Sequence, residues 1–156
     1  MKLFFKTLFV SICLINMIGC DYSFEKYIYG DNFKTYLKKE FYFDLDDKHF
    51  YYLIDLEGCS SCVQKNLDML EELVSTNSLK DDVFIIFIGS LYIKDLEGKF
   101  ETIFLNSKCL IDDQGKAFLY ELGLSKPLLI KSDSNHYKSW LVSDFEIDKV
   151  KSFIKK

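Results

Sequence analysis

Residues 50–62 read FYYLIDLEGCSSC and join an apolar, aromatic-rich run to two cysteines separated by two serines. The run 50–56 has the length and composition of a buried β-strand. After the second cysteine, apolar side chains recur three and four residues apart, at Val63, Leu67, Leu70 and Val74. This spacing marks one face of a helix. The sequence therefore predicts a strand, a sharp turn that Gly58 permits, and a helix that begins at the cysteine pair.

The predicted placement of the pair has a chemical consequence. Cys59 lies in the strand-to-helix turn and Cys62 in the first turn of the helix. The first turn of a helix carries unpaired N–H groups and a partial positive charge, and both stabilise a thiolate, which is the nucleophilic form of cysteine. A two-residue spacer also brings both sulfurs within bonding reach. We therefore interpret the pair as a redox pair, with a structural disulfide as the alternative.

A zinc site is the third interpretation of a C-x-x-C motif, and the rest of the chain does not favour it. Zinc needs two further ligands, and structural sites usually supply them as a second close pair. The candidates are widely scattered: Cys109, His49 and His136. We therefore expect no metal and no organic cofactor. Cys109 lies in an apolar run and is interpreted as a buried small side chain, with a third redox thiol as the alternative.

The remaining pattern predicts one α/β domain over residues 32–156. Residues 83–88 are a continuous apolar run, typical of a central strand covered on both faces. Further strands are predicted at 41–45, 108–111, 128–130 and 136–142, and helices are predicted after Asn32 and over 95–105 and 117–122. Pro127, the only proline, stands at the start of a strand, where proline is tolerated. Ser143 and Glu146 form a capping box that opens a last helix.

The N-terminus predicts export. Residues 1–19 combine two early lysines with an uncharged apolar run too short to span a bilayer, which is the pattern of a signal peptide. The run ends in Met17-Ile18-Gly19-Cys20, which resembles a bacterial lipobox, with a plain signal peptide or an uncleaved anchor as alternatives. Lipid on Cys20 would tether the chain to a membrane in the cell envelope, facing the periplasm or the outer surface. Residues 20–31 are expected to be the tether.

Composition limits the partners. The chain has 156 residues and a formal net charge of −4, and all 20 of its basic residues are lysine. Nucleic-acid binding relies on clustered positive charge, so a nucleic-acid partner is not expected. The absence of arginine also argues against a peroxidase that would use an arginine beside its cysteine.

The layout from Tyr42 to Lys156 resembles the thioredoxin-like superfamily, and within it the membrane-tethered TlpA/ResA-type thiol-disulfide oxidoreductases. The resemblance rests on the strand, the C-x-x-C pair, the helix, and Pro127 before the penultimate strand. It implies a three-layer fold with a central mixed sheet flanked by helices. It also implies that Pro127 is cis and close to Cys59, and that the backbone before it, with Lys126, binds an extended substrate peptide. Gly58 replaces the usual tryptophan, Ser60 and Ser61 replace Gly-Pro, and Lys126 replaces a small or β-branched residue.

The resemblance implies a thiol-disulfide oxidoreductase whose partners are protein thiols or disulfides and an upstream redox protein. Cys59 would attack the substrate and Cys62 would resolve the mixed disulfide. Glu57, close to the motif, is the candidate for proton transfer. The alternative is a non-catalytic thioredoxin-like binding lipoprotein in which Cys59 and Cys62 form a permanent structural disulfide.

Overall fold

The computed structural model describes residues 24–43, 48–89, 97–134 and 136–156, and for 97–99 it describes the backbone. In chain order, the elements are β1 (Glu25–Lys26), α2 (Gly30–Phe41), β2 (Phe50–Asp55), α3 (Ser60–Ser75), β3 (Val83–Ile88), α4 (Glu97–Asn106), β4 (Lys108–Asp112), the short 3₁₀ helix η2 (Lys116–Tyr120), β5 (Leu128–Asp133), β6 (His136–Leu141) and α5 (Ile147–Ile154). Helical connections therefore separate β2, β3, β4 and β5, whereas β5 and β6 follow one another directly.

The strands form one mixed sheet in the order β1-β6-β5-β2-β3-β4. β2, β3 and β4 run parallel, as strands joined by crossover helices must. β5 is antiparallel to β2, and β6 pairs with β5 as a hairpin. The predicted α/β class, with a central mixed sheet flanked by helices, is confirmed.

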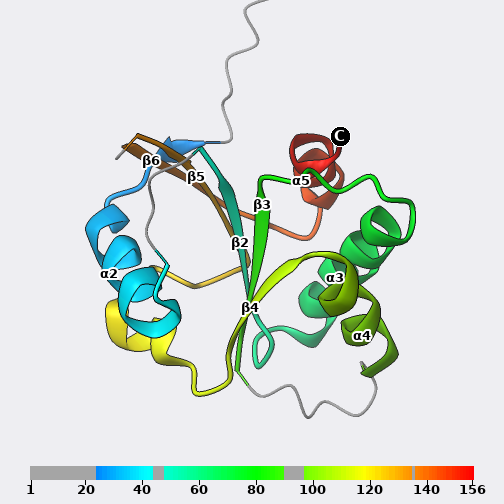
Figure 1. Ribbon diagram of the computed structural model, residues 1–156, viewed down its shortest axis with the longest axis horizontal. Helices are drawn as coiled ribbons and strands as arrows, with labels where there is room; N and C mark the ends of the chain where they lie inside the picture. Colours follow the sequence, from blue (N-terminus) through cyan, green and yellow to red (C-terminus); the bar gives the residue numbers. More distant parts are fainter. Residues whose placement is uncertain (1–23, 44–47, 90–96, 135) are drawn as a thin grey trace, which may run out of the picture.

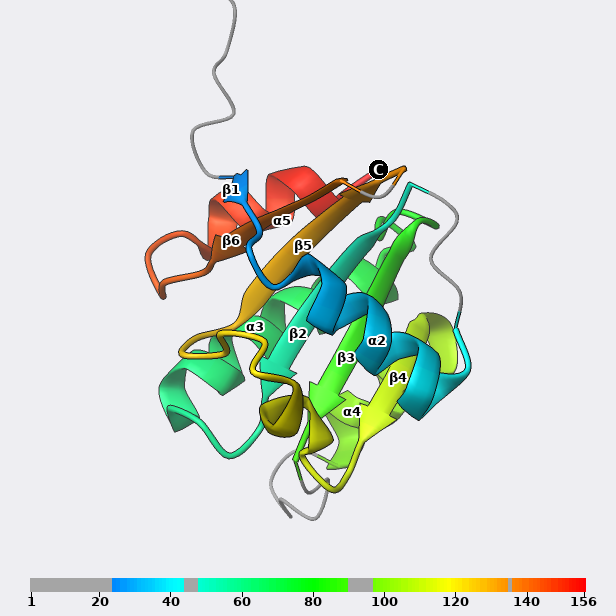
Figure 2. The same cartoon turned by 90° about the vertical axis from the view of Figure 1, so that its left-hand side faces the viewer.

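Helices cover both faces of the sheet. Figure 1 shows the sheet between α2 with η2 on one side and α3, α4 and α5 on the other. Figure 2, turned by 90°, shows α2 crossing in front of the central strands. This arrangement explains why β3 is apolar at every position, because all six of its side chains are buried between helices.

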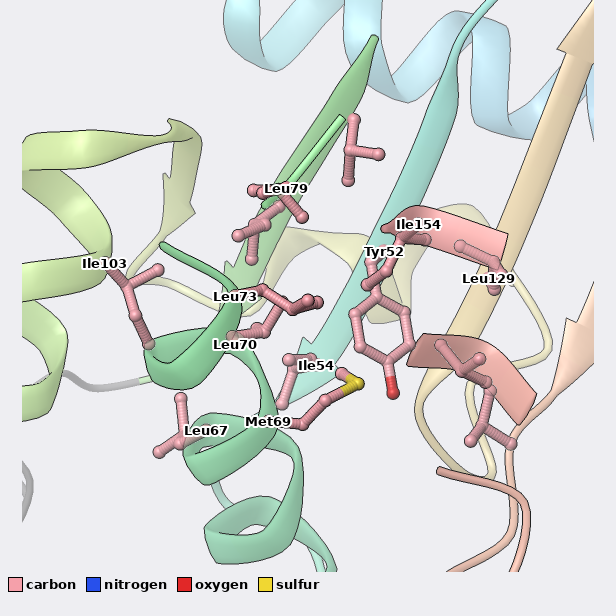
Figure 3. Packing of buried hydrophobic residues seen from close by; sticks show 14 of the residues in the cluster. Tyr52, Ile54, Leu67, Met69, Leu70, Leu73, Leu79, Ile103, Leu129 and Ile154 are labelled. Carbon is pink, nitrogen blue, oxygen red and sulfur yellow. The ribbon is translucent and has the colours of Figure 1, made fainter. Parts of the chain in front are cut away.

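The core divides into two clusters, one on each face of the sheet. Alternate residues of β2 point to opposite faces, so Tyr52 and Ile54 join the α3 side while Tyr51 and Leu53 join the α2 side. Figure 3 shows leucines of α3 facing Tyr52 and Ile54 of β2. The apolar spacing after Cys62 therefore marks the buried face of α3, as the sequence predicted.

Two local expectations were wrong. The last part of the segment expected as a tether belongs to the fold, because β1 pairs with β6 and Phe24 is buried. A strand of two residues is too short to show the alternation of apolar and polar residues by which strands are predicted from a sequence. The strand expected to begin at residue 41 is not found in the described residues 41–43. α2 continues to Phe41, and Tyr42 ends the helix with a left-handed backbone (φ 55°).

The predicted signal peptide and the predicted lipid site at Cys20 lie outside the described residues. Within the described ranges, no helix combines the length and the apolar character needed to cross a membrane.

Candidate redox site

The cysteine pair lies where β2 passes into α3, as predicted. Cys59 is the residue before the first turn of α3, and its carbonyl accepts the first helical hydrogen bond from Val63 N–H at 3.0 Å. Cys59 is exposed, Cys62 is half-buried, and both are free thiols. Gly58 has an ordinary backbone, but a Cβ there would lie 3.3 Å from the carbonyl oxygen of Asp55, so the turn leaves little room for a side chain.

The surroundings of Cys59 favour its thiolate. Its sulfur lies 3.2 Å from the Ser61 hydroxyl. Hydrogen bonds from Ser61 and then from Cys62 lower the pKa of Cys59 to about 7 from the ordinary 9.0. The first turn of α3 holds no acidic residue, so nothing there offsets the positive end of the helix. Cys59 therefore loses its proton more readily than an ordinary cysteine does.

The surroundings of Cys62 disfavour its thiolate. The carboxylate of Asp144, ahead of Cys59 and of burial, raises the pKa of Cys62 to about 12. The same interaction, together with Lys65, holds the pKa of Asp144 below its usual range. The site therefore contains one acidified thiol and one thiol that stays protonated at neutral pH.

A buried polar chain holds the backbone at Cys62. The Tyr52 hydroxyl donates to Asn66 Oδ1, and Asn66 Nδ2 donates to the carbonyl oxygen of Cys62 at 2.7 Å. Asn66 is 1% exposed and Tyr52 is fully buried, and burial raises the pKa of the Tyr52 phenol. Each donor in this dry region has a partner, so the chain ties the start of α3 to β2.

The segment that contains Lys126 and Pro127 reaches the same end of the sheet. Leu53 of β2 pairs with Leu128 of β5, so the antiparallel register carries Pro127 and Lys126 alongside the last residues of β2, just before the cysteine turn. Pro127 is buried and Lys126 is exposed. The expected cis peptide bond is absent: residues 126 and 127 are joined in trans, the isomer that an X–Pro bond intrinsically favours by about 0.5–1 kcal/mol.

Glu57 lies in the turn, with its backbone N–H donating to Asp55 Oδ1 at 3.0 Å. Its side chain packs over Gly89, where a Cβ would lie 3.0 Å from Glu57 Cγ. Cys109, expected as a buried small side chain, is half-buried on β4 and packs against the core, with its sulfur 3.1 Å from the Ser107 hydroxyl. Burial raises the pKa of the Cys109 thiol.

Asp144 is the site residue that sequence reasoning missed. In the sequence it is only an interior residue of the capping box between Ser143 and Glu146, and that box does form, with Ser143 N–H donating to Glu146 Oε2 at 3.2 Å. No local spacing connects Asp144 with Cys62, because they belong to different elements. Only the docking of the β6–α5 turn on α3 brings the two side chains together.

Among the described residues, no group of three or more histidine, cysteine, aspartate or glutamate side chains is arranged to hold a metal ion.

Comparisons with known proteins give distant structural similarity. No protein-family model and no curated protein matches the chain. One similar solved structure is a secreted Mycobacterium tuberculosis disulfide oxidoreductase homologous to E. coli DsbE, with 12% identity, a TM-score of 0.48, and coverage of 72% of this chain and 86% of that one. Another is a DsbF homologue from Corynebacterium diphtheriae, with 18% identity, a TM-score of 0.40, and coverage of 69% and 72%. Both similarities are too weak to transfer a function to this chain.

Proposed function

We propose that the chain is a thiol-disulfide oxidoreductase that acts through Cys59 and Cys62. The observation that carries the proposal is the contrast between the two thiols at one helix start. Cys59 is exposed with a pKa of about 7, and Cys62 is half-buried with a pKa of about 12. A thiol whose pKa is near the ambient pH is close to the optimum for attack on a disulfide.

The reaction follows from this contrast. The Cys59 thiolate attacks one sulfur of a substrate disulfide, and the other sulfur leaves as a thiolate. Cys62 then loses its proton and attacks Cys59, so the Cys59–substrate bond breaks and the Cys59–Cys62 bond forms. Two electrons pass from the protein to the substrate. The same steps in reverse oxidise a substrate dithiol.

The surrounding residues have proposed roles in the same reaction. The exposed Lys126 and the backbone before Pro127 lie at the sheet end that carries Cys59, and they bind the substrate polypeptide. Glu57, which lies in the turn, is a candidate for proton transfer. Its Glu57→Gln variant tests this role, because a proton-transfer residue would change the pH profile of turnover and a surface residue would not.

The proposed location is the cell envelope, with a lipid on Cys20 anchoring the chain to a membrane. The support is the lipobox-like end of the signal sequence. Protein thiols or disulfides and an upstream redox protein would then be its partners. Cys20→Ala is expected to abolish incorporation of labelled palmitate and to move the chain out of the membrane fraction.

Exchange with oxidised glutathione tests the activity. The reduced full-length chain should react rapidly, Cys59→Ser should not react at the motif, and Cys62→Ser should accumulate a mixed disulfide on Cys59. Cys109→Ser is the matched control and should retain the wild-type rate, because Cys109 lies half-buried on β4.

A redox titration separates this activity from a structural disulfide. A structural Cys59–Cys62 bond would have a potential below about −300 mV, whereas an exchanging one lies higher. Equal exchange rates for the wild type and Cys59→Ser, with a potential below that limit, would favour the non-catalytic binding module.

A further inference from the structure

Three lysines form a row across the sheet beside its β1 edge. Lys26 of β1 lies directly opposite Lys138 of β6, and Lys138 lies directly opposite Lys131 of β5. Directly opposed residues of paired strands point to the same face, with their side chains starting about 5 Å apart. Like charges in these positions destabilise a sheet. A conflict of this kind is expected where a surface has a function, so we ask what this lysine row binds.

The lysine row has no acidic partner of its own. Lys26 and Lys138 are exposed and Lys131 is half-buried. Lys131 Nζ lies 5.8 Å from the centre of the Phe50 ring, and Lys80 Nζ lies 5.5 Å from the same ring. Within the part of the chain that the structure describes, no ion pair joins an acid to a lysine of the row.

The nearest acids in the sheet do not neutralise the row. Glu25 precedes Lys26 in β1, but successive side chains of a strand point to opposite faces, so Glu25 points away from the row. Asp133, at the end of β5, lies 3.4 Å from Lys48 Nζ. Asp31 lines the groove of about 460 Å³ that the row borders. The row therefore keeps three unpaired positive charges in a chain whose formal net charge is −4.

An exposed apolar side chain lies next to the row. Ile28 follows Lys26 by two residues, is 76% exposed, and lines the same groove as Lys26 and Lys138. Lysines attract the phosphates of anionic lipids, and apolar side chains beside them enter the boundary between headgroups and acyl chains. The combination therefore fits an anionic membrane surface.

The row also lies close to the predicted lipid site in the chain. Phe24, the first described residue, directly precedes β1, and three residues separate it from Cys20. A fully extended chain spans at most about 14 Å from Cys20 to Phe24. A lipid on Cys20 would therefore keep the lysine row within reach of the membrane surface.

We propose that the lysine row binds the anionic phospholipids of the membrane to which Cys20 is anchored, with Ile28 entering the headgroup layer. This inference rests on the proposed lipid anchor. The row supplies positive charge at the corner of the molecule that the anchor holds down, although the whole chain is acidic and would otherwise be repelled by an anionic surface.

This contact orients the redox site away from the membrane. Lys131 pairs with Phe50, so the row is level with the start of β2. From there β2 rises about 17 Å to Asp55, just before the cysteine turn. Figures 1 and 2 show β1 and β6 at the top of the molecule and the turn from β2 to α3 at the bottom. Cys59 therefore faces soluble partners rather than the lipid.

The first test measures binding to vesicles without the lipid anchor. The full-length chain with Cys20→Ala is sedimented with phosphatidylcholine vesicles that contain or lack phosphatidylglycerol. Residues 1–19 are common to all variants, so differences between variants report on the mutated lysines. Each lysine near an anionic surface contributes about fivefold to binding. Lys26→Gln combined with Lys138→Gln should therefore weaken binding to the phosphatidylglycerol vesicles about 25-fold and leave binding to pure phosphatidylcholine unchanged.

The matched control removes the same charge elsewhere. Lys39→Gln combined with Lys149→Gln changes exposed lysines of α2 and α5 and should weaken binding less than about twofold. Urea unfolding checks the fold of the row variant, which should be no less stable because opposed like charges are removed. The proposal is overturned if the row variant binds phosphatidylglycerol as well as its parent, the outcome expected if the row serves an acidic protein. Equal losses in the control would also overturn it.

The second test measures orientation in the lipidated full-length chain. The chain is reconstituted on both kinds of vesicle and treated with a water-soluble amine reagent, and labelling is followed by peptide mass mapping. Lys26 and Lys138 should react several-fold more slowly on vesicles with phosphatidylglycerol, whereas Lys39 should react equally on both. Equal labelling of Lys26 on the two surfaces contradicts the proposal.

The two tests separate this inference from the proposals on which it rests. If the chain does not exchange with oxidised glutathione, the redox function fails, while vesicle binding still decides the role of the row. If Cys20 takes up no labelled palmitate, the anchor fails, and the sedimentation of the Cys20→Ala chain still measures whether Lys26 and Lys138 bind anionic lipid.

Discussion

The chemistry of the site depends on which side chains contact each sulfur. Cys59 and Cys62 share a helix turn, yet the pKa of one is lowered and that of the other is raised. The helix end acts on both sulfurs, so it cannot account for the difference. The hydrogen bond from Ser61 to one sulfur and the carboxylate of Asp144 at the other account for it.

At the residue scale, we predict that Ser61→Ala raises the pKa of Cys59. The Ser61 hydroxyl is the largest cause of the lowered pKa, so its loss should move the midpoint of Cys59 alkylation from about 7 toward the ordinary 9.0. A thiolate forms above its pKa, so the variant should react more slowly at pH 7 and recover as the pH rises. Alkylation against pH, followed at the Cys59 peptide, measures the midpoint.

Ser60→Ala is the matched control, since it removes a hydroxyl from the same spacer and should leave the midpoint near 7. An unmoved midpoint in Ser61→Ala would mean that Cys62 and the helix end acidify Cys59 without help from the Ser61 hydroxyl.

The sequence predicted part of the site and missed the rest for a physical reason. The cysteine pair and the start of α3 follow from local spacing, because a strand, a turn and a helical face are all local patterns. Asp144 does not, because its meeting with Cys62 depends on how the β6–α5 turn docks on α3. The resemblance implied a cis peptide bond before Pro127, whereas the structure has a trans bond there.

At the scale of the elements, β2 and α3 are joined by polar groups inside an otherwise apolar layer. The Tyr52 hydroxyl and the Asn66 amide satisfy each other and hold the Cys62 carbonyl. Buried polar groups are costly unless all are paired, so a chain of this kind fixes one arrangement of the two elements.

We predict that Asn66→Ala lowers the free energy of unfolding by about 1–3 kcal/mol, because it leaves the buried Tyr52 hydroxyl without an acceptor. Urea unfolding of the full-length chain measures the change. Tyr52→Phe should lower the free energy of unfolding less in the Asn66→Ala variant than in the wild type, since the Tyr52 hydroxyl is already unpaired in that variant.

Gln64→Ala, on the exposed side of α3, should change the stability by less than about 0.5 kcal/mol. Additive effects of the two core substitutions would contradict a shared network.

Element prediction succeeded where the pattern is long. The apolar face of α3 was expected from its spacing of three and four residues, and β3 was expected from a continuous apolar run of six residues. It failed for β1, which has two residues, and at the start of 41–45, where Phe41 belongs to α2 and Tyr42 has a left-handed backbone. Short segments take their structure from the surfaces they pack on, and a single sequence does not show those surfaces.

At the scale of the whole molecule, the N-terminal segment closes one edge of the fold. β1 pairs with β6, and the Phe24 ring before it packs edge-to-face on Trp140 and Phe153, with centroid distances of 5.8 and 5.4 Å. Trp140 and Phe153 also contact each other at 5.6 Å. Three separate parts of the chain therefore meet in one aromatic cluster on the face that α5 covers.

We predict that Phe24→Ala lowers the free energy of unfolding by about 3 kcal/mol, the lower end of the range for a buried phenylalanine, because the site lies at a sheet edge and can partly collapse. Phe24 is 8% exposed, whereas Ile28, four residues later, is 76% exposed. Ile28→Ala should therefore change stability by less than about 0.5 kcal/mol. Urea unfolding followed by Trp140 fluorescence reports directly on the cluster, since Trp140 is the only tryptophan. If both substitutions had equal, small effects on the free energy of unfolding, the packing of Phe24 would not stabilise the fold. The segment before α2 would then act as a tether.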